Sequence, residues 1–280
     1  MRALHLTGTL VLVACGAEEG TPTAPTPSST AAPFHFVDVT AESGLGAFRQ
    51  VSGSAGKPFI NESFGAGVAL FDVDGDGDLD AYLTNGSTQA AVDSPESEKP
   101  ADALYLNDGS GHFEDATLAA GLGDRSWTYG VTVGDYDGDG HPDLYLTNDG
   151  PNRLYRNRGD GTFEDVTAAM GVGGAHWSTG ATFLDYDRDG DLDLYVANHI
   201  AFDRASIALR GLRETYFDVD VYYGPGGLDA VADVLYRNDG EHFTDVSQES
   251  GIAAVALYGF HVVSFDHDQD GWPDIYVAND

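Results

Sequence analysis

The stretch FDVDGDGDLDAYLTN, from Phe71 to Asn85, decides the fold, because its central pattern occurs four times in the chain. The pattern reads D-x-D-x-D-G-x-x-D, and we number its positions 1 to 9 and its copies loops 1 to 4. The copies run from Asp72 to Asp80, Asp135 to Asp143, Asp185 to Asp193 and Asp266 to Asp274. Carboxylates at positions 1, 3, 5 and 9 with glycine at position 6 predict a chelate for a hard cation with several oxygen ligands. Calcium fits that donor set best.

The spacing indicates which groups would bind the ion. Alternate residues turn their carboxylates towards one centre, and glycine at position 6 permits the positive φ of a tight reversal. Position 7 holds no common residue type, so we expect its backbone carbonyl to bind. Solvated Asx turns are the alternative interpretation, and four intact copies disfavour it. The predicted ligands are Asp72, Asp74, Asp76, Asp78, Asp80, Asp135, Asp137, Asp139, His141, Asp143, Asp185, Asp187, Asp189, Asp191, Asp193, Asp266, Asp268, Asp270, Trp272 and Asp274, with Asp78, His141, Asp191 and Trp272 binding through the carbonyl.

The sequences around the loops distinguish them from EF-hands, which have helices on both sides and a glutamate at position 12. The loops are preceded by GVALF, GVTVG, GATFL and HVVSF, and they are followed by DAYLTN, DLYLTN, DLYVAN and DIYVAN. Short runs rich in Val, Leu and Tyr are typical of strands. We therefore expect each loop to join two antiparallel strands.

A second element also repeats four times. It reads FVDVTAESGL (36–45), FEDATLAAGL (113–122), FEDVTAAMGV (163–172) and FTDVSQESGI (243–252). The last three copies follow the segments LYLNDGSGHF, LYRNRGDGTF and LYRNDGEHF, which predict hairpins. An aromatic residue also stands eight positions before every loop, as Phe64, Trp127, Trp177 and Tyr258. A four-stranded unit with a period of about 50 residues indicates a β-propeller.

The expected fold is all-β, with three full blades (64–118, 127–168 and 177–248), half of a fourth blade, and a lone strand from Phe36 to Thr40 that would pair with the last blade. Two stretches interrupt the repeat. Residues 87–102 are polar, so we expect a solvated loop. Residues 199–231 contain DRASIALRGLRE, a candidate short helix, followed by several aromatics. That insertion either contacts a ligand or packs its aromatics on the blade edge.

The N-terminal segment differs in composition from the repeats. Residues 1–15 combine an early arginine with a short apolar run that ends in Leu-Val-Ala-Cys. This pattern is similar to a bacterial lipoprotein signal, in which Cys15 would become the acylated first residue. A misassigned start with an ordinary buried cysteine is the alternative. Residues 16–33 are rich in Thr, Pro and Ser, and we expect an extended linker. The propeller repeats then occupy residues 34–280.

The charge of the chain restricts its partners. The chain has 46 acidic and 13 basic residues, which give a formal net charge of -33. The loops contain 18 of the acids, so four calcium ions would offset only part of the excess. We therefore exclude nucleic acid and anionic membrane surfaces as partners, apart from a lipid anchor at Cys15.

The phrases FDVDGDGDLD, LYLNDGSGHFEDAT and YYGPGGLDAVADVLYRNDGEHFTDVS resemble the VCBS or FG-GAP repeats of the cartilage acidic protein and ASPIC/UnbV family. The fold of that family is similar to the integrin α-subunit propeller. The resemblance covers residues 34–280 and implies calcium at the four sets of aspartates. It also implies a seven-bladed ring, so we expect this chain to be an N-terminal fragment.

Two functions are compatible with these observations. The first is a non-enzymatic, calcium-stabilised propeller outside the cytoplasm, in the cell envelope or secreted, that binds an unknown protein or glycan. The second is a calcium-assisted polysaccharide lyase or hydrolase. Its candidate acid or base groups are His176, His199, His242 and His261, but none has a patterned partner. Since the chain also lacks the common catalytic motifs, we favour the binding protein and assign no catalytic residue.

Overall fold

The computed structural model describes residues 36–57, 59–94, 98–202, 213–216, 219–222, 225 and 227–280. The predicted signal (1–15) and linker (16–33) lie outside these ranges. The chain divides into two compact units, residues 1–39 and 40–280, and all of the elements below belong to the second. In the first, residues 36–39 form no strand, and Thr40 begins a turn. The lone strand predicted from Phe36 to Thr40 was therefore wrong, because a single extended segment is stable only beside a hydrogen-bonded neighbour.

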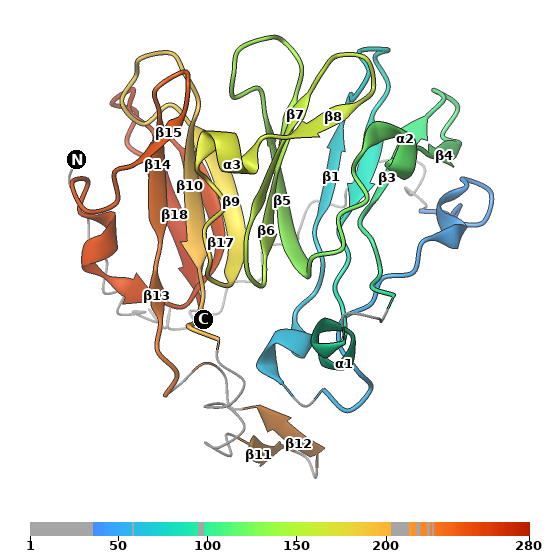
Figure 1. Cartoon of the computed structure of the whole chain (residues 1–280), viewed down its shortest axis with the longest axis horizontal. Helices are drawn as coiled ribbons and strands as arrows, with labels where there is room; N and C mark the ends of the chain where they lie inside the picture. Colours follow the sequence, from blue (N-terminus) through green and yellow to red (C-terminus); the bar gives the residue numbers. More distant parts are fainter. Residues whose placement is uncertain are drawn as a thin grey trace, which may run out of the picture. The chain divides into compact units, whose positions relative to one another are not determined.

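Three four-stranded antiparallel sheets and one two-stranded hairpin make up most of the described part of the second unit (Figure 1). Sheet 1 contains β1 (Val68–Phe71), β2 (Asp80–Leu83), β3 (Ala103–Asn107) and β4 (Phe113–Asp115). Sheet 2 contains β5 (Thr128–Gly134), β6 (Asp143–Asn148), β7 (Arg153–Asn157) and β8 (Phe163–Asp165). Sheet 3 contains β9 (Ser178–Leu184), β10 (Asp193–Asn198), β14 (Val234–Asn238) and β15 (Phe243–Asp245). The hairpin pairs β17 (Gly259–Phe265) with β18 (Asp274–Asn279). The all-β prediction is confirmed, and the three sheets and the hairpin correspond to propeller blades.

The smaller elements lie in the connections. Two short ribbons pair β11 (Arg213–Tyr216) with β12 (Val219–Tyr222) and β13 (Val231–Ala232) with β16 (Ala256–Leu257). The helices are α1 (Gln89–Asp93), α2 (Thr117–Ala120) and α3 (Thr167–Met170), with 3-10 turns η1 (Leu45–Ala47), η2 (Ile60–Ser63) and η3 (Ile252–Ala254).

Both predicted insertions differ in part from expectation. Residues 87–102 include helix α1, and Ser87, Gln89 and Asp102 are buried, so this stretch is not simply a solvated loop. The Thr88 side chain accepts a hydrogen bond from the Ala91 amide and starts the helix as an N-cap. In the second insertion, the last residues of the predicted helix DRASIALRGLRE form the start of β11. The rest of that segment lies outside the described residues.

The first strands of successive sheets approach each other through glycine. A Cβ on Gly67 would lie 3.1 Å from Gly130 Cα, and a Cβ on Gly130 would lie 3.0 Å from the Thr179 carbonyl oxygen. A Cβ on Gly180 would lie 3.4 Å from His261 Cα, which is an ordinary van der Waals distance. Because a side chain at Gly67 or Gly130 would press on the neighbouring backbone, glycine lets the first strands of sheets 1, 2 and 3 pack closely in series. In the fourth repeat, the exposed His261 replaces the glycine.

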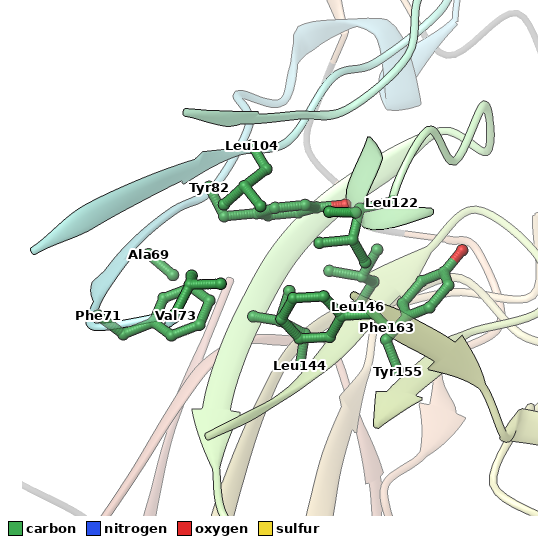
Figure 2. Packing of buried hydrophobic residues seen from close by; sticks show 11 residues of the cluster. Ala69, Phe71, Val73, Tyr82, Leu104, Leu122, Leu144, Leu146, Tyr155 and Phe163 are labelled. Atoms are coloured by element: carbon green, nitrogen blue, oxygen red, sulfur yellow. The ribbon is translucent and has the colours of Figure 1, made fainter. Parts of the chain in front are cut away.

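The hydrophobic cores lie between successive sheets. In Figure 2, Ala69, Phe71, Tyr82 and Leu104 of sheet 1 pack with Leu144, Leu146, Tyr155 and Phe163 of sheet 2. Equivalent clusters join sheet 2 to sheet 3 and sheet 3 to the hairpin. Each large apolar side chain buried in this way contributes about 1.5–3 kcal/mol relative to exposure. Sheet-to-sheet packing is therefore what stabilises elements that are only three to seven residues long.

The repeated F-x-D-V-T/S element has a local structural reason. In sheet 1 the Asp115 carboxylate accepts hydrogen bonds from the amide of Thr117 (2.9 Å) and from its hydroxyl (2.6 Å). The Thr117 hydroxyl in turn accepts the Leu104 amide on β3. The same pair of contacts recurs in the other two sheets. The aspartate thus fixes the turn after the fourth strand, and the hydroxyl attaches that turn to the third strand.

Candidate metal centres

Each acidic loop joins the first two strands of its sheet, as predicted. Position 9 is the first residue of the second strand, and it pairs with the last residue of the first strand. These pairs are Phe71 with Asp80, Gly134 with Asp143, Leu184 with Asp193 and Phe265 with Asp274. The loops are flanked by strands and not by helices, so they are not EF-hands.

The position 1 carboxylate organises the backbone of each loop. In loop 2, Asp135 accepts hydrogen bonds from the amides of Asp139 (3.0 Å) and Gly140 (2.9 Å). The other three loops make the same pair of bonds. Position 6 has a φ of 84–102° in the four loops, which confirms the need for glycine.

Position 4 also has a positive φ in every loop, and the sequence analysis missed this constraint. Glycine fills it in loops 1 and 2, but Arg188 and Gln269 adopt φ values of 64° and 63° in loops 3 and 4. Non-glycine residues rarely take this conformation. The turn geometry is therefore set by the whole loop rather than by its glycines alone.

The position 9 carboxylate connects the loop to the rest of its sheet. Asp143 is fully buried and accepts the amide of Tyr136 at position 2 (3.1 Å) and the amide of Asn157 at the end of β7 (2.8 Å). Asp80 and Asp193 are buried in the same way and accept the corresponding amides in sheets 1 and 3. Asp274 accepts the His267 amide and is exposed.

Three carboxylates come together in every loop, at positions 1, 3 and 9. Their nearest oxygens lie within 4.8 Å of one another, so each group could hold a metal ion. The groups are Asp72, Asp74 and Asp80; Asp135, Asp137 and Asp143; Asp185, Asp187 and Asp193; and Asp266, Asp268 and Asp274.

Position 5 does not belong to these groups. Its carboxylate accepts the amide of position 7 in all four loops, at 2.9–3.0 Å. Asp76, Asp139, Asp189 and Asp270 therefore form Asx turns in this conformation. The carbonyl role of position 7 stays a prediction.

The electrostatics of the groups in loops 1, 2 and 3 favour a bound cation. Burial raises the pKa of Asp143 to about 7 and that of Asp193 to about 6, and the charges at positions 3 and 5 add to the rise. Burial also raises the pKa of Asp80. Carboxylates held this close oppose ionisation. A divalent ion between the oxygens would offset both the repulsion and the loss of hydration.

An asparagine that the sequence analysis did not single out links loop 1 to sheet 2, and its equivalent links loop 2 to sheet 3. The Asn157 side-chain amide donates to the carbonyl oxygen of Val73 in loop 1, at 2.9 Å. Asn238 makes the same bond to Tyr136 in loop 2, at 2.8 Å. Both asparagines stand in the repeated L-Y-R-N phrase at the end of the third strand. That recurrence was the available signal, although nothing local indicated a partner in another sheet.

The aromatics that stand eight positions before the loops gather near the start of the first strands, at the ends away from the loops. The rings of Phe64 and Trp177 lie 4.8 Å apart, and Tyr129 lies 5.3 Å from Trp177. His199, one of the candidate acid or base groups, is buried in this cluster, where its Nδ1 lies 3.0 Å from the Gly259 carbonyl oxygen. Burial lowers its pKa. These observations indicate a packing role for His199.

The other three candidate histidines are exposed and do not form a common site with His199. His176 lies in the turn before β9, and His261 lies on β17. His242 lies in the β14–β15 turn, with its Nε2 at 4.0 Å from the Asp239 carboxylate. The structure thus brings no pair of these histidines together as an acid and a base among the described residues.

One comparison with known proteins agrees with the repeat pattern. The FG-GAP-like repeat matches residues 72–146 and again residues 135–196. No curated protein matches the chain. Among solved structures, the chain is similar to a lectin of Agrocybe aegerita described as recognising non-reducing terminal N-acetylglucosamine. The identity is 16%, the TM-score is 0.33, and the match covers 76% of this chain and 42% of the lectin chain. Among the described residues, every helix is too short or too polar to cross a membrane.

Proposed function

Because the chain carries FG-GAP-like repeats over residues 72–196, we propose that it is a calcium-binding propeller that acts outside the cytoplasm as a binding or adhesion scaffold for a protein or a glycan. One observation supports the metal above all others. Every loop brings the carboxylates at positions 1, 3 and 9 within 4.8 Å of one another. Oxygen-only donor sets of this kind suit calcium.

In this proposal calcium has a structural role. The position 9 carboxylate already holds both its own loop and the third strand, through amides such as those of Tyr136 and Asn157. An ion bound to the same carboxylate would fix the loop, the third strand and the asparagine that reaches the preceding loop. Metal binding would then stiffen the contact between successive sheets, and with it any surface that the sheets present.

The location follows from the affinity that such loops need. Exposed loops with few prearranged ligands suit compartments where calcium is abundant and dissociation constants of about 10⁻⁴–10⁻³ M are sufficient. An extracytoplasmic site, with or without a lipid anchor at Cys15, meets that condition. Cys15 and the rest of the predicted signal lie outside the described residues. The closer relationship to the ASPIC/UnbV group also stays a prediction, since the repeat match ends at residue 196.

The test of calcium binding uses metal-free protein. Calcium titration by calorimetry should show about four ions per chain, and EDTA should lower the melting temperature, which calcium but not sodium restores. A melting temperature that changes with neither EDTA nor calcium would show that the loops are ordinary Asx turns. A glycan array probed with and without EDTA then examines the ligand, and calcium-dependent binding is the expected result.

The non-enzymatic role has its own test. The protein is incubated in calcium with acidic and neutral polysaccharides, and new reducing or unsaturated ends are measured. We expect no cleavage. Cleavage that disappears in the His261→Ala variant would instead favour the lyase or hydrolase, with this exposed residue of β17 as the acid or base.

A further inference from the structure

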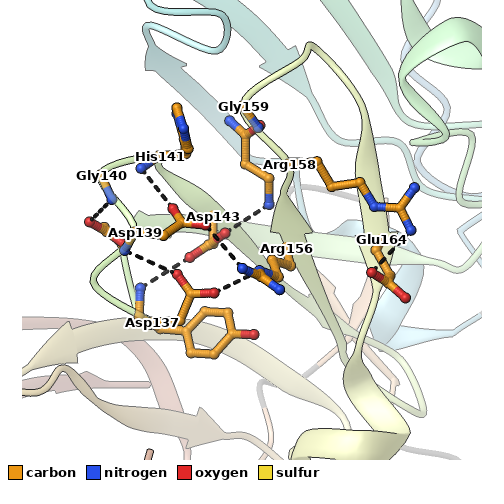
Figure 3. A network of polar contacts seen from close by, with 12 residues as sticks. Asp137, Asp139, Gly140, His141, Asp143, Arg156, Arg158, Gly159 and Glu164 are labelled. Carbon is orange, nitrogen blue, oxygen red and sulfur yellow. Dashed lines mark hydrogen bonds and ion pairs between the residues drawn. The ribbon is translucent and has the colours of Figure 1, made fainter.

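Two carboxylates of loop 2 already pair with a cationic side chain. In sheet 2, Nε of Arg156 lies 2.6 Å from Oδ2 of Asp137, and its Nη2 lies 3.2 Å from Oδ2 of Asp139 (Figure 3). Asp137 and Asp139 occupy positions 3 and 5 of loop 2. A guanidinium that is hydrogen-bonded to Asp139 and ion-paired with Asp137 competes with any other cation for the same oxygens.

The strand register identifies the equivalent residues of the other sheets. Arg156 pairs with Glu164, the residue after the aromatic of the fourth strand, and Leu106 and Arg237 pair with the equivalent residues of sheets 1 and 3. Loop 1 therefore has an uncharged leucine at this place. Sheet 3 has an arginine at this place, as sheet 2 does. The presence of the arginine alone therefore does not determine which carboxylates its guanidinium contacts.

The guanidinium of Arg237 is held elsewhere. Its Nε lies 2.8 Å from Oδ1 of Asp239, two residues along the chain, and its Nη1 lies 3.7 Å from the Glu249 carboxylate. It also contacts the Tyr186 side chain at position 2 of loop 3. Arg237 thus lies within reach of loop 3 while its main partner belongs to the hairpin turn.

The residue two positions after the arginine accounts for the difference. In sheet 3 this residue is Asp239, which attracts Arg237. In sheet 2 it is Arg158, which repels Arg156 and forms its own ion pair with Glu164, at 3.0 Å. Both places are equivalent in the hairpins, since the amides of Arg158 and Asp239 each donate to the carbonyl across the turn. Arg156 is therefore left to the carboxylates of loop 2.

We propose that Arg156 is a built-in competitor for calcium in loop 2, and that the residue two positions later decides whether a sheet directs its arginine onto its metal loop. This inference rests on the proposed calcium binding. Calcium must displace the guanidinium before it can bind Asp137, so loop 2 binds more weakly than loop 3 and fills later. A single charge in the hairpin turn thereby decides that loop 3 fills before loop 2.

The test follows each loop separately. The position 6 glycine amides, Gly77, Gly140, Gly190 and Gly271, donate to the position 1 carboxylates, so each is a reporter in a two-dimensional amide NMR spectrum. Calcium is added stepwise to the deuterated 280-residue chain. In the wild type, we expect the midpoint of the Gly140 shift at a higher calcium concentration than that of Gly190.

Three variants examine the mechanism. Arg156→Leu copies sheet 1, and Arg158→Asp copies sheet 3, so both should lower the Gly140 midpoint by about two- to fivefold, the effect of roughly 0.5–1 kcal/mol. Asp239→Arg should raise the Gly190 midpoint and leave Gly140 unchanged. All three side chains are at least 30% exposed, so the fold should tolerate the changes, and amide spectra at saturating calcium verify this.

The outcomes separate this inference from the proposed function. If the glycine amides of the wild type do not respond to millimolar calcium, the calcium proposal itself fails. If they respond but the Gly140 midpoint is the same in the wild type, Arg156→Leu and Arg158→Asp, the loops bind calcium and the competitor role of Arg156 is overturned.

Discussion

Replacing Asp102 with asparagine should make the protein more stable at alkaline pH. Asp102 is 1% exposed and accepts hydrogen bonds from the Asn85 amide (2.6 Å), the Thr128 hydroxyl (3.0 Å) and the Tyr82 hydroxyl (3.2 Å). Burial raises its pKa to about 8, and the nearby charge of Asp124 adds to the rise. In sheet 2 the same place is filled by Asn152, which accepts the Asn148 amide and donates to a serine hydroxyl.

The sign of the effect follows from proton binding. Between pH 4 and pH 8 the folded chain keeps a proton on Asp102 that the unfolded chain has lost, since the unfolded pKa is about 3.9. The free energy of unfolding therefore falls as the pH rises through this window, and it levels off above the folded pKa. Each pKa unit corresponds to 1.36 kcal/mol, so the loss from pH 5 to pH 8 has a ceiling of about 4 kcal/mol. We expect about 2–4 kcal/mol.

The assay is thermal unfolding followed by circular dichroism at pH 5–8.5, with calcium held at saturation. At pH 5, Asp102→Asn and the wild type should melt at similar temperatures. At pH 8 the variant should melt roughly 5–10 °C higher, at about 2–4 °C per kcal/mol for a domain of this size. Other carboxylates titrate in both proteins, so the difference between the two curves isolates Asp102.

The matched control introduces the carboxylate in sheet 2. Asn152→Asp should make the protein less stable at pH 8 than at pH 5, relative to the wild type, because its carboxylate would be buried in the same way. A difference between Asp102→Asn and the wild type that stays constant from pH 5 to pH 8.5 would refute the reasoning.

Three further outcomes are expected. Asn157→Ala should cost about 2–3 kcal/mol in urea unfolding, because it removes the donor to the Val73 carbonyl oxygen of loop 1 and to the partly buried Pro142 carbonyl oxygen of loop 2. Asn107→Ala should cost less than half as much, because its side-chain amide donates to the Leu79 carbonyl oxygen of its own sheet, near solvent. Gly130→Ala should lower the melting temperature by several degrees, since its Cβ would lie 2.7 Å from Thr147 Oγ1 and 3.0 Å from the Thr179 carbonyl oxygen of sheet 3. An unchanged melting temperature would contradict the close packing of the first strands. In calorimetry, Asp187→Asn should weaken calcium binding more than Asp189→Asn, because only the former residue belongs to a gathered group; the reverse order would show that calcium rearranges the loop.

The fourfold repeat predicted most of the fold because its signals are short-range. The spacing of aspartates, the glycine at position 6 and the alternating flanks each act over fewer than about ten residues. These signals predicted the strands on both sides of every loop, the three hairpins and the limits of the sheets. The lone strand at Phe36–Thr40 did not, because a strand needs a neighbour that the local sequence cannot specify.

The structure brings together only part of the predicted ligand set, for a local reason. The sequence placed positions 1, 3, 5 and 9 in one group, while the structure brings together positions 1, 3 and 9. Position 5 instead bonds the amide two residues later. The choice between a metal ligand and an Asx turn depends on small backbone rotations, which identical residue types do not encode.

By itself, the sequence determined that this chain is an all-β protein built on four acidic turns, because those turns are closed by bonds between near neighbours. Only the tertiary structure decided what the turns are attached to. Asn157 meets Val73 across 84 residues of chain, and Asn238 meets Tyr136 across 102. The position of the Arg156 charge depends likewise on a hairpin folding back onto its loop. Such contacts arise from the packing of whole sheets, so the spacing of residues in the sequence does not predict them.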